Sequence, residues 1–184
     1  MNRVTHTKKL KSTIKFYKNS FGLHSPFLIL CDPNFLFAAI DSKIGIELRL
    51  AELFKGQVYL KITQCGIKEM ESIKEPLMKN ALQFSKNHCQ IFKCSHKKMI
   101  PSDCIVDNLK NGFKGAVATQ DKKLAQLIHN HYPHIILFYI KEGLQIMSPS
   151  QKLKDKIRAE IEAKYSTTTI EMEKPSIEEE KPEE

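Results

Sequence analysis

The sequence predicts a three-layer α/β fold with a mainly parallel central sheet. Short runs of apolar and β-branched residues alternate along the chain with longer amphipathic segments, which is the pattern of strands joined by helical crossovers. The chain has 184 residues, of which 41% are hydrophobic, so it can form one domain with a substantial core. It contains no apolar run near the roughly 18 residues that a membrane helix needs.

The expected strands are short and rich in apolar residues. The run PFLILC is almost entirely apolar, as expected for a buried strand, and QVYLKIT combines β-branched and aromatic residues at strand length. HIILFYI and LQIM flank the tripeptide KEG, which predicts a hairpin at the edge of the sheet. In chain order, the expected strands are 26–31, 57–63, 89–94, 115–119, 134–140 and 144–147.

Helices are expected between these strands. Asp32 has the chemistry of an N-cap and precedes Pro33, which suits the first helical position. The segment IELRLAELF is amphipathic, and SDCIVDNLKNG begins with a capping Ser and ends in Asn-Gly. The expected helices are 32–40, 46–54, 65–74, 76–87, 102–112, 121–131 and 150–165.

Charge divides the chain into a basic body and an acidic tail. The net charge is +8, but residues 168–184 hold seven Glu and two Lys, a net of −5, so the remainder carries +13. The first 18 residues contain six Lys or Arg and no acid. We therefore expect a basic N-terminal arm over residues 1–20, a globular domain over 21–149, a charged helix over 150–166 and a disordered acidic tail over 167–184.

A basic body favours a polyanionic partner, and nucleic acid is the commonest one. The alternative is a basic protein whose charge serves only solubility. Charge alone favours neither interpretation over the other.

Four acidic residues are expected at one edge of the sheet. Asp32 directly follows the first strand, Asp121 follows the strand 115–119, Asp103 lies in the first turn of an expected helix, and Glu69 lies one turn into another. Ligands gather at the carboxyl ends of parallel strands, and clustered carboxylates favour a divalent cation. A Mg²⁺ or Mn²⁺ pair held there would activate water for phosphodiester cleavage. The alternative is that each acid is a helix cap or a solvated charge.

The stretch KCSHKKMIPSDC contains three residues that bind soft metals, Cys94, His96 and Cys104. The N-terminus shows no secretory signal, so we expect the five cysteines in a reducing compartment, where clustered Cys and His indicate a metal rather than disulfides. A closed zinc site needs four ligands. The spacing differs from that of the common CxxC fingers, so the local pattern alone is moderately specific.

The fourth ligand has three candidates, Cys65, Cys89 and His88. We favour Cys65, because it follows the strand 57–63 and therefore lies at the same sheet edge as the acids. Cys89 would lie along a strand from Cys94 and can point elsewhere. The alternative for every cysteine is the role of a small buried hydrophobe, which suits Cys31 best because it ends an apolar strand.

The chain resembles PIN-domain proteins of the small-subunit processome, the U three protein twenty-three family, sister of the Faf1-copurifying factor. The resemblance covers about residues 14–150. It is carried by several motifs in order: FYKNSFGLHSPFLILCDPNFL, ITQCGIKEMESI, KCSHKKMIPSDCIVDNL, AVATQDKKL and LQIMSPS. The opening segment, ITQC and MSPS favour the first of the two sister families.

This resemblance implies a PIN-like fold with a CCHC zinc site. The zinc ligands would be Cys65, Cys94, His96 and Cys104, and the carboxylates of the nuclease site would be Asp32, Glu69, Asp103 and Asp121. The resemblance further implies a nuclear, nucleolar role in early rRNA processing for the small subunit, with pre-rRNA, snoRNA and other processome proteins as partners. It implies no membrane and no small-molecule substrate.

The chain departs from the family pattern at two places. Lys123 stands where relatives carry a second aspartate after the strand 115–119, and its charge would weaken metal binding by the acids. The acidic tail replaces the basic C-terminus of many relatives. Glu69, in contrast, retains an acid that the first sister family often lacks.

The leading hypothesis is therefore a non-catalytic or weakly catalytic RNA-binding assembly factor. Phosphates would be contacted by basic residues, with Phe16 and Tyr17 available to stack on bases. An active Mg²⁺- or Mn²⁺-dependent PIN endoribonuclease is the alternative, and a zinc-braced protein-interaction module is a weaker third. The expected RNA contacts are Arg3, Lys8, Lys9, Lys11, Lys15, Lys18, Lys97 and Lys98.

Overall fold

The computed structural model describes residues 3–97 and 99–172, and the chain divides into two compact units between Pro149 and Ser150. The expected acidic tail lies outside the described residues from residue 173 onward, and so does Lys98. In the second unit, the described residues form one helix, α8 (Gln151–Met172), which is longer than the charged helix expected there. No helix in the described part of the chain is long and apolar enough to span a membrane.

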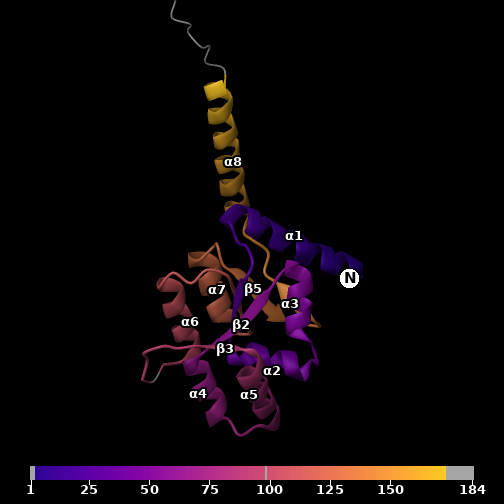
Figure 1. The fold of residues 1–184 in the computed structure, drawn as a ribbon, viewed down its shortest axis with the longest axis vertical. Coiled ribbons are helices and arrows are strands. Elements are labelled where there is room, and N and C mark those ends of the chain that lie inside the picture. Colours follow the sequence, from indigo (N-terminus) through magenta and orange to yellow (C-terminus); the bar gives the residue numbers. More distant parts are fainter. Residues whose placement is uncertain (1–2, 98, 173–184) are drawn as a thin grey trace, which may run out of the picture. The chain divides into compact units, whose positions relative to one another are not determined.

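The first unit is built on a six-stranded sheet in the order β3-β2-β1-β4-β5-β6. Figure 1 shows the strands of this unit surrounded by helices. All neighbouring strands are parallel except β5 and β6, which form an antiparallel hairpin at the edge. The predicted α/β class with a mainly parallel sheet is thereby confirmed. The strands are β1 (Phe27–Cys31), β2 (Val58–Thr63), β3 (Gln90–Phe92), β4 (Ala116–Ala118), β5 (Ile136–Ile140) and β6 (Leu144–Ile146).

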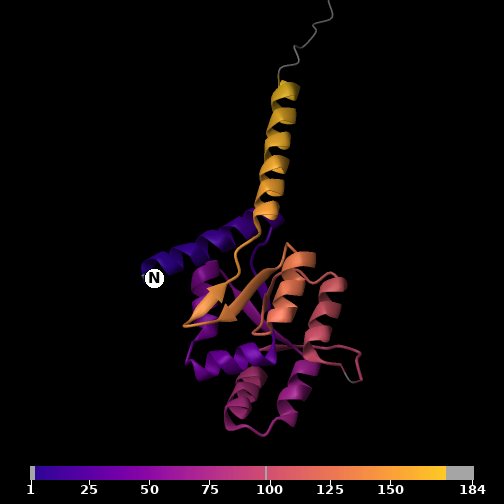
Figure 2. The ribbon, with the colours of Figure 1, turned by 180° about the vertical axis from the view of Figure 1, so that it is seen from behind.

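Helices cover both faces of this sheet and make three layers (Figure 2). The strands supply both cores by alternation: Ile29 and Cys31 belong to one core, and Leu30 between them belongs to the other. The first core includes side chains of α1, α2, α3 and α5, and the second includes side chains of α6 and α7. The helices are α1 (Arg3–Phe21), α2 (Pro33–Asp41), α3 (Ile46–Phe54), α4 (Gln64–Ser72), α5 (Pro76–His88), α6 (Pro101–Lys110) and α7 (Lys122–His131).

Helix α1 occupies most of the segment that the sequence predicts to be a basic arm. Its residues Leu10, Ile14 and Tyr17 lie at helical spacing and are buried in the first core. Lys18 is also engaged, because its Nζ donates a hydrogen bond to the Phe54 carbonyl at 3.1 Å and lies 4.7 Å from the centre of the Phe27 ring. The amino-terminal segment is therefore part of the folded unit rather than a separate arm.

Gly115, at the entry to β4, is fixed by the close approach of β1. Its φ is +147°, and a Cβ atom added there would lie 2.3 Å from the Leu28 carbonyl oxygen. That oxygen is backbone within a paired strand, so it cannot move aside without disturbing the sheet. Only glycine allows β4 to enter the sheet next to β1 at this point.

Replacing Gly115 with Ala should destabilise the protein by several kcal/mol, because steric overlap adds to the strain of a positive φ. Urea unfolding of the two proteins measures this difference. Gly112→Ala is the matched control, since Gly112 also has a positive φ, of +87°, but has nothing within 4 Å of the added Cβ. The control should lose only about 1 kcal/mol. Equal losses in both variants would show that the contact with Leu28 is unimportant.

Candidate metal centre and acidic edge

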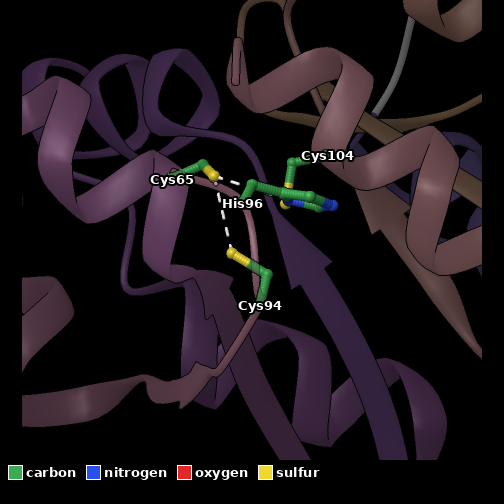
Figure 3. A group of neighbouring side chains, drawn as sticks. All are labelled: Cys65, Cys94, His96 and Cys104. Carbon is green, nitrogen blue, oxygen red and sulfur yellow. Dashed lines mark hydrogen bonds between the residues drawn. The ribbon is translucent and has the colours of Figure 1, made fainter. Parts of the chain in front are cut away.

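Four side chains from three parts of the chain meet at the carboxyl end of β2. Cys65 lies in the first turn of α4, Cys94 and His96 follow β3, and Cys104 lies in the first turn of α6 (Figure 3). Their ligand atoms all lie within 4.8 Å of one another. The structure thus brings together the four residues that the sequence analysis nominated as metal ligands. We call them the CCHC cluster.

Local capping places Cys65 in this cluster. Thr63, the last residue of β2, is the N-cap of α4, and its Oγ1 accepts a hydrogen bond from N of Gly66 at 3.0 Å. The strand therefore turns directly into the helix, and Cys65 begins that helix next to the loop that follows β3. A Cβ atom at Gly66 would lie 3.2 to 3.3 Å from Ile62, Pro33 and Thr63, so the turn is tightly packed.

The cluster has the chemistry and the spacing of a closed metal site. Cys65 Sγ lies 3.4 Å from Cys94 Sγ and 3.7 Å from His96 Nδ1. Two thiolates on one tetrahedral zinc ion would be about 3.8 Å apart, given Zn–S bonds of about 2.3 Å. The four residues could therefore hold one metal ion after only a small adjustment of the side chains.

The three thiols of the cluster differ in how readily they ionise. Burial disfavours the thiolate of Cys94, but hydrogen bonds from Cys65, Cys104 and His96 outweigh it and lower the pKa of Cys94 to about 7. Burial raises the pKa of Cys65 and raises that of Cys104 to about 12. Among these three thiols, only the pKa of Cys94 is lowered, so its surroundings favour the thiolate form in which a cysteine binds a metal ion.

The other candidates for the fourth ligand lie elsewhere. Cys89 and Cys31 are buried in the first core, where burial raises the pKa of both thiols. His88 pairs with Glu47, with Nδ1 and Oε2 2.9 Å apart, and its ring stacks on that of Phe84. The interpretation of Cys31 as a small buried hydrophobe agrees with its position in the core.

Three of the four expected carboxylates interact near the ends of β1 and β4. Asp32 follows β1 and is only 3% exposed, and its Oδ2 accepts a hydrogen bond from Thr119 Oγ1 at 3.3 Å. Burial, reinforced by the charges of Glu69 and Asp121, raises the pKa of Asp32 to about 7 against the opposing hydrogen bonds. Burial also raises the pKa of Glu69. We call Asp32, Glu69 and Asp121 the acidic edge.

Helix capping explains only one of these acids. Asp121 Oδ1 accepts hydrogen bonds from N of Lys123 at 2.8 Å and N of Leu124 at 3.2 Å, so Asp121 caps α7. Asp32 occupies the N-cap position of α2 but makes no side-chain capping bond. Its buried carboxyl group is instead held mainly by Thr119, with a smaller contribution from the Asn34 backbone in the first turn of α2.

The side chains of Asp103 and Lys123 are both exposed. Asp103 is exposed in the first turn of α6, whereas the next residue, Cys104, is buried in the CCHC cluster. Within the described residues, no hydrogen bond or ion pair joins Asp103 to Asp32, and none joins the exposed Lys123 side chain to an acid. The interactions recorded among the described residues thus link Asp32 with Glu69 and Asp121, and the place of Asp103 in this site stays a prediction.

The expected RNA contacts fall into two groups. Lys8, Lys9 and Lys15 are exposed on α1, whereas Lys11 lies 3.7 Å from Glu52 and Lys18 is engaged as described above. The expectation that Tyr17 can stack on a base is wrong, because its ring is 3% exposed within the core. Phe16 packs edge-on against that ring and is half-buried. The side chain of Arg3 is not among those described.

Lys97 lines a cleft that the sequence analysis did not foresee. The cleft has a volume of about 380 Å³ and lies between α4 and the segment that precedes α6. Lys68 and Glu69 of α4 and the exposed Met99 and Ile100 contribute to its walls. Lys68 belongs to no recognisable sequence motif. The one signal that could have identified it is its position next to Glu69. Basic and apolar side chains therefore line the same cleft as Glu69, a member of the acidic edge.

Known proteins share the sequence pattern of this domain. A family model described as Fcf1 matches residues 52–149, which are 98 of the 184 residues. The rRNA-processing protein utp23 of Schizosaccharomyces pombe is 28% identical over 176 residues, which are 92% of this chain and 64% of that protein. The rRNA-processing protein FCF1 of Saccharomyces cerevisiae is 27% identical over 118 residues, which are 64% of this chain and 62% of that protein. The chain thus spans less than two thirds of the length of these curated relatives.

A solved structure shares the fold. The structure of the PIN domain endonuclease Utp24 superposes with a TM-score of 0.60 and 25% sequence identity, covering 66% of this chain and 91% of that chain. The first unit is therefore a PIN-like α/β domain. The residues matched by the family model contain the whole CCHC cluster, together with Glu69 and Asp121.

The raised pKa of Asp32 predicts a pH-dependent effect of Asp32→Asn on stability. The folded state holds the Asp32 proton up to about pH 7, whereas the unfolded chain releases it near pH 4. The stabilisation linked to this proton is complete below pH 4 and is lost as the pH rises through 7. Asp32→Asn cannot ionise, so at pH 8 it should be more stable than wild type by a few kcal/mol, on the order of the shift times 1.4.

Urea unfolding between pH 4 and 8, without added divalent cations, measures this difference. The gain of Asp32→Asn over wild type should shrink steadily towards pH 4. Asp41→Asn is the control, since Asp41 is exposed at the end of α2 and its replacement should change the stability only slightly. A gain for Asp32→Asn that is the same at pH 4 and pH 8 would contradict the assignment of a buried, proton-binding carboxyl group.

Proposed function

The chain belongs to the Fcf1 family, and from that premise we propose that it is an RNA-binding ribosome-biogenesis factor. It would act in the nucleolus, within the small-subunit processome, in early processing of the small-subunit rRNA. Two relatives that support this role are both described as rRNA-processing proteins. Its partners would be pre-rRNA, a snoRNA and other processome proteins.

The observation that carries the proposal is the exposed positive charge of the domain. Lys8, Lys9, Lys15 and Lys97 are exposed, and no ion pair among the described residues engages them. Outside residues 168–184 the chain carries a net charge of +13. Unpaired lysines on a folded surface bind phosphates and release counterions, which supports RNA as the partner.

We also propose that the CCHC cluster binds one structural zinc ion through Cys65, Cys94, His96 and Cys104. Three thiolates and one imidazole form a tetrahedral set with no open position, which suits a structural ion rather than a catalytic one. The bound ion would supply cross-links between α4, the segment after β3 and α6. Cys94 and His96 follow the short strand β3, which lies at the edge of the sheet, so the bound ion would tie this segment to α4 and α6.

Purified protein should contain one equivalent of zinc, and Cys94→Ser should lose most of it, because a neutral hydroxyl group replaces the most readily ionised thiol. Elemental analysis measures the metal content of both proteins. Cys89→Ala is the matched control, because Cys89 is a buried cysteine outside the cluster, and this variant should keep its zinc. Wild-type protein without metal, or Cys94→Ser with full metal content, would contradict the assignment.

A second candidate function is that of a Mg²⁺- or Mn²⁺-dependent endoribonuclease. The acidic edge favours it, because Asp32, Glu69 and Asp121 affect one another and a divalent cation would relieve their repulsion. Related chemistry is named for the structural neighbour, described as a PIN domain endonuclease. Lys123 weighs against it, since a basic residue stands where relatives carry a second aspartate, and Asp103 is more exposed than the other three acids.

Two sets of variants separate the functions. In Asp32→Asn with Asp121→Asn the acidic edge loses two of its three carboxyl groups, while Asn at position 121 can still cap α7. This double variant should bind RNA as wild type does, and wild-type protein should show no Mn²⁺-dependent cleavage. Cleavage by wild type that the double variant lacks would establish the nuclease instead.

Replacing Lys8, Lys9 and Lys15 with Ala should weaken RNA binding and reduce the salt dependence of the affinity. Three phosphate contacts correspond to a change of about 2 in the slope of log affinity against log salt for single-stranded RNA. The control with equal charge change replaces the exposed Lys74, Lys79 and Lys141, and it should keep most of the affinity and slope. Titrations at several salt concentrations measure both values. Identical slopes in the two triple variants would rule out α1 as the contact surface.

A further inference from the structure

We propose that Asp107 is a positioning residue of the metal centre, which holds the His96 imidazole so that its Nδ1 faces the metal ion. The inference rests on the proposed metal site and concerns a residue outside the CCHC cluster. Asp107 lies on α6, three residues after Cys104. Residues at this spacing share one face of a helix, so α6 would supply both a ligand and the residue that orients another ligand.

The two nitrogens of His96 face different chemical groups. Nδ1 lies 3.7 Å from Cys65 Sγ, on the side of the thiols, whereas Nε2 lies 3.1 Å from Asp107 Oδ2. An ionised carboxylate only accepts hydrogen bonds, so Nε2 carries the proton in this contact. In a neutral imidazole with its proton on Nε2, the lone pair is on Nδ1 and points towards the thiols. The contact thereby selects the tautomer that can bind a metal ion within the cluster.

Asp107 is itself held in place from the same helix. Asn111 lies one turn further along α6, and its Nδ2 donates a hydrogen bond to Asp107 Oδ2 at 3.3 Å. The same oxygen therefore accepts from both His96 and Asn111. A carboxylate fixed in this way restrains the ring of His96 more strongly than a freely rotating one would.

The neighbouring residue Asn108 makes a comparable contact to a second ligand. Its Nδ2 donates to the Cys104 carbonyl at 2.7 Å and lies 3.8 Å from Cys104 Sγ. Asn108 is buried, so this amide is a fixed donor beside the thiol. Asp107 and Asn108 on α6 and Asn111 at its C-cap thus form a second layer of polar groups around the ligands.

His96 depends on such a contact because it lies in a segment without regular secondary structure. The segment between β3 and α6 contributes Cys94 and His96, and no backbone ladder fixes their side chains. The side chain of His96 is 15% exposed and that of Asp107 is 43% exposed, so their hydrogen bond lies at the border of the domain. Loss of a residue in this second layer weakens metal binding about 10- to 100-fold in characterised metal sites.

An ordinary surface ion pair between Asp107 and a protonated His96 is the competing interpretation. It would leave the tautomer of the metal-bound imidazole undetermined, and its removal would leave metal affinity unchanged. Positioning instead predicts a defined tautomer and a loss of affinity. The two interpretations therefore differ in quantities that can be measured on the zinc-loaded full chain.

Zinc affinity, measured by competition with a chromophoric chelator, should fall about 10- to 100-fold in Asp107→Ala. Asp107→Asn should lose less, because its amide oxygen still accepts the bond but carries no charge. Asp41→Ala, which removes an exposed aspartate at the end of α2, is the control and should keep wild-type affinity. The absorption spectrum of the cobalt-loaded protein should shift in Asp107→Ala and stay constant in the control. Wild-type affinity in Asp107→Ala would overturn the proposal.

The tautomer can be read directly in wild-type protein by long-range ¹H–¹⁵N correlation of the zinc-loaded form. The proton should be found on Nε2 of His96 and the metal on Nδ1. This measurement and the Asp107→Asn affinity decide the question even if Asp107→Ala does not fold. Zinc bound through Nε2 would overturn the role of Asp107 while leaving the metal site intact. Wild-type protein that binds no metal would overturn the metal site and this inference together.

Discussion

The parallel pairing of β1 with β2 on one side and β4 on the other is the constraint on which the candidate sites depend. In this register Cys31 pairs with Ile62 and also with Ala118. The next residues, Asp32, Thr63 and Thr119, therefore leave the sheet side by side. Thr63 caps the helix that follows it, and Thr119 donates a hydrogen bond to Asp32 on the neighbouring strand end. A shift of one residue in either pairing would send these side chains to opposite faces.

From this edge the chain builds two adjacent sites with a shared helix. Thr63 caps α4, which places Cys65 in the CCHC cluster, and Glu69 lies four residues later on the same helix. Thr119 donates to the buried Asp32 carboxylate and accepts from N of Asp121, which in turn caps α7. The Thr119 hydroxyl group thus hydrogen-bonds both Asp32, after β1, and the backbone of Asp121, before α7. A metal ion in the cluster would fix α4 and, through it, the position of Glu69 at the acidic edge.

The acidic edge and the basic surface differ in their effect on stability, because Asp32 is buried whereas the lysines of α1 are exposed. Burial of Asp32 beside two other acids costs stability near neutral pH, and the hydrogen bonds from Thr119 and from the Asn34 backbone offset only part of this cost. A domain kept only for binding could replace this residue without harm to its core. That Asp32 is buried and hydrogen-bonded, rather than exposed, is the strongest reason to test for divalent cations. The lysines of α1, in contrast, lie on the solvent side of a helix whose other side is core.

The sequence by itself determined the fold class, the order of strands and helices and the identity of the ligand types. Alternating apolar and amphipathic segments encode these features locally, and the KEG hairpin and the Asn-Gly helix end are short-range signals. Helix α1 was not predicted, because the segment is rich in lysine and its buried face includes only a few apolar residues, among them Leu10, Ile14 and Tyr17. The tertiary structure confirms the predicted choice of Cys65 over Cys89, and it alone shows that Asp103 is exposed and that Asp107 contacts His96. These outcomes depend on which residues far apart in the chain become neighbours, and strand register and helix rotation fix that only when the whole domain packs.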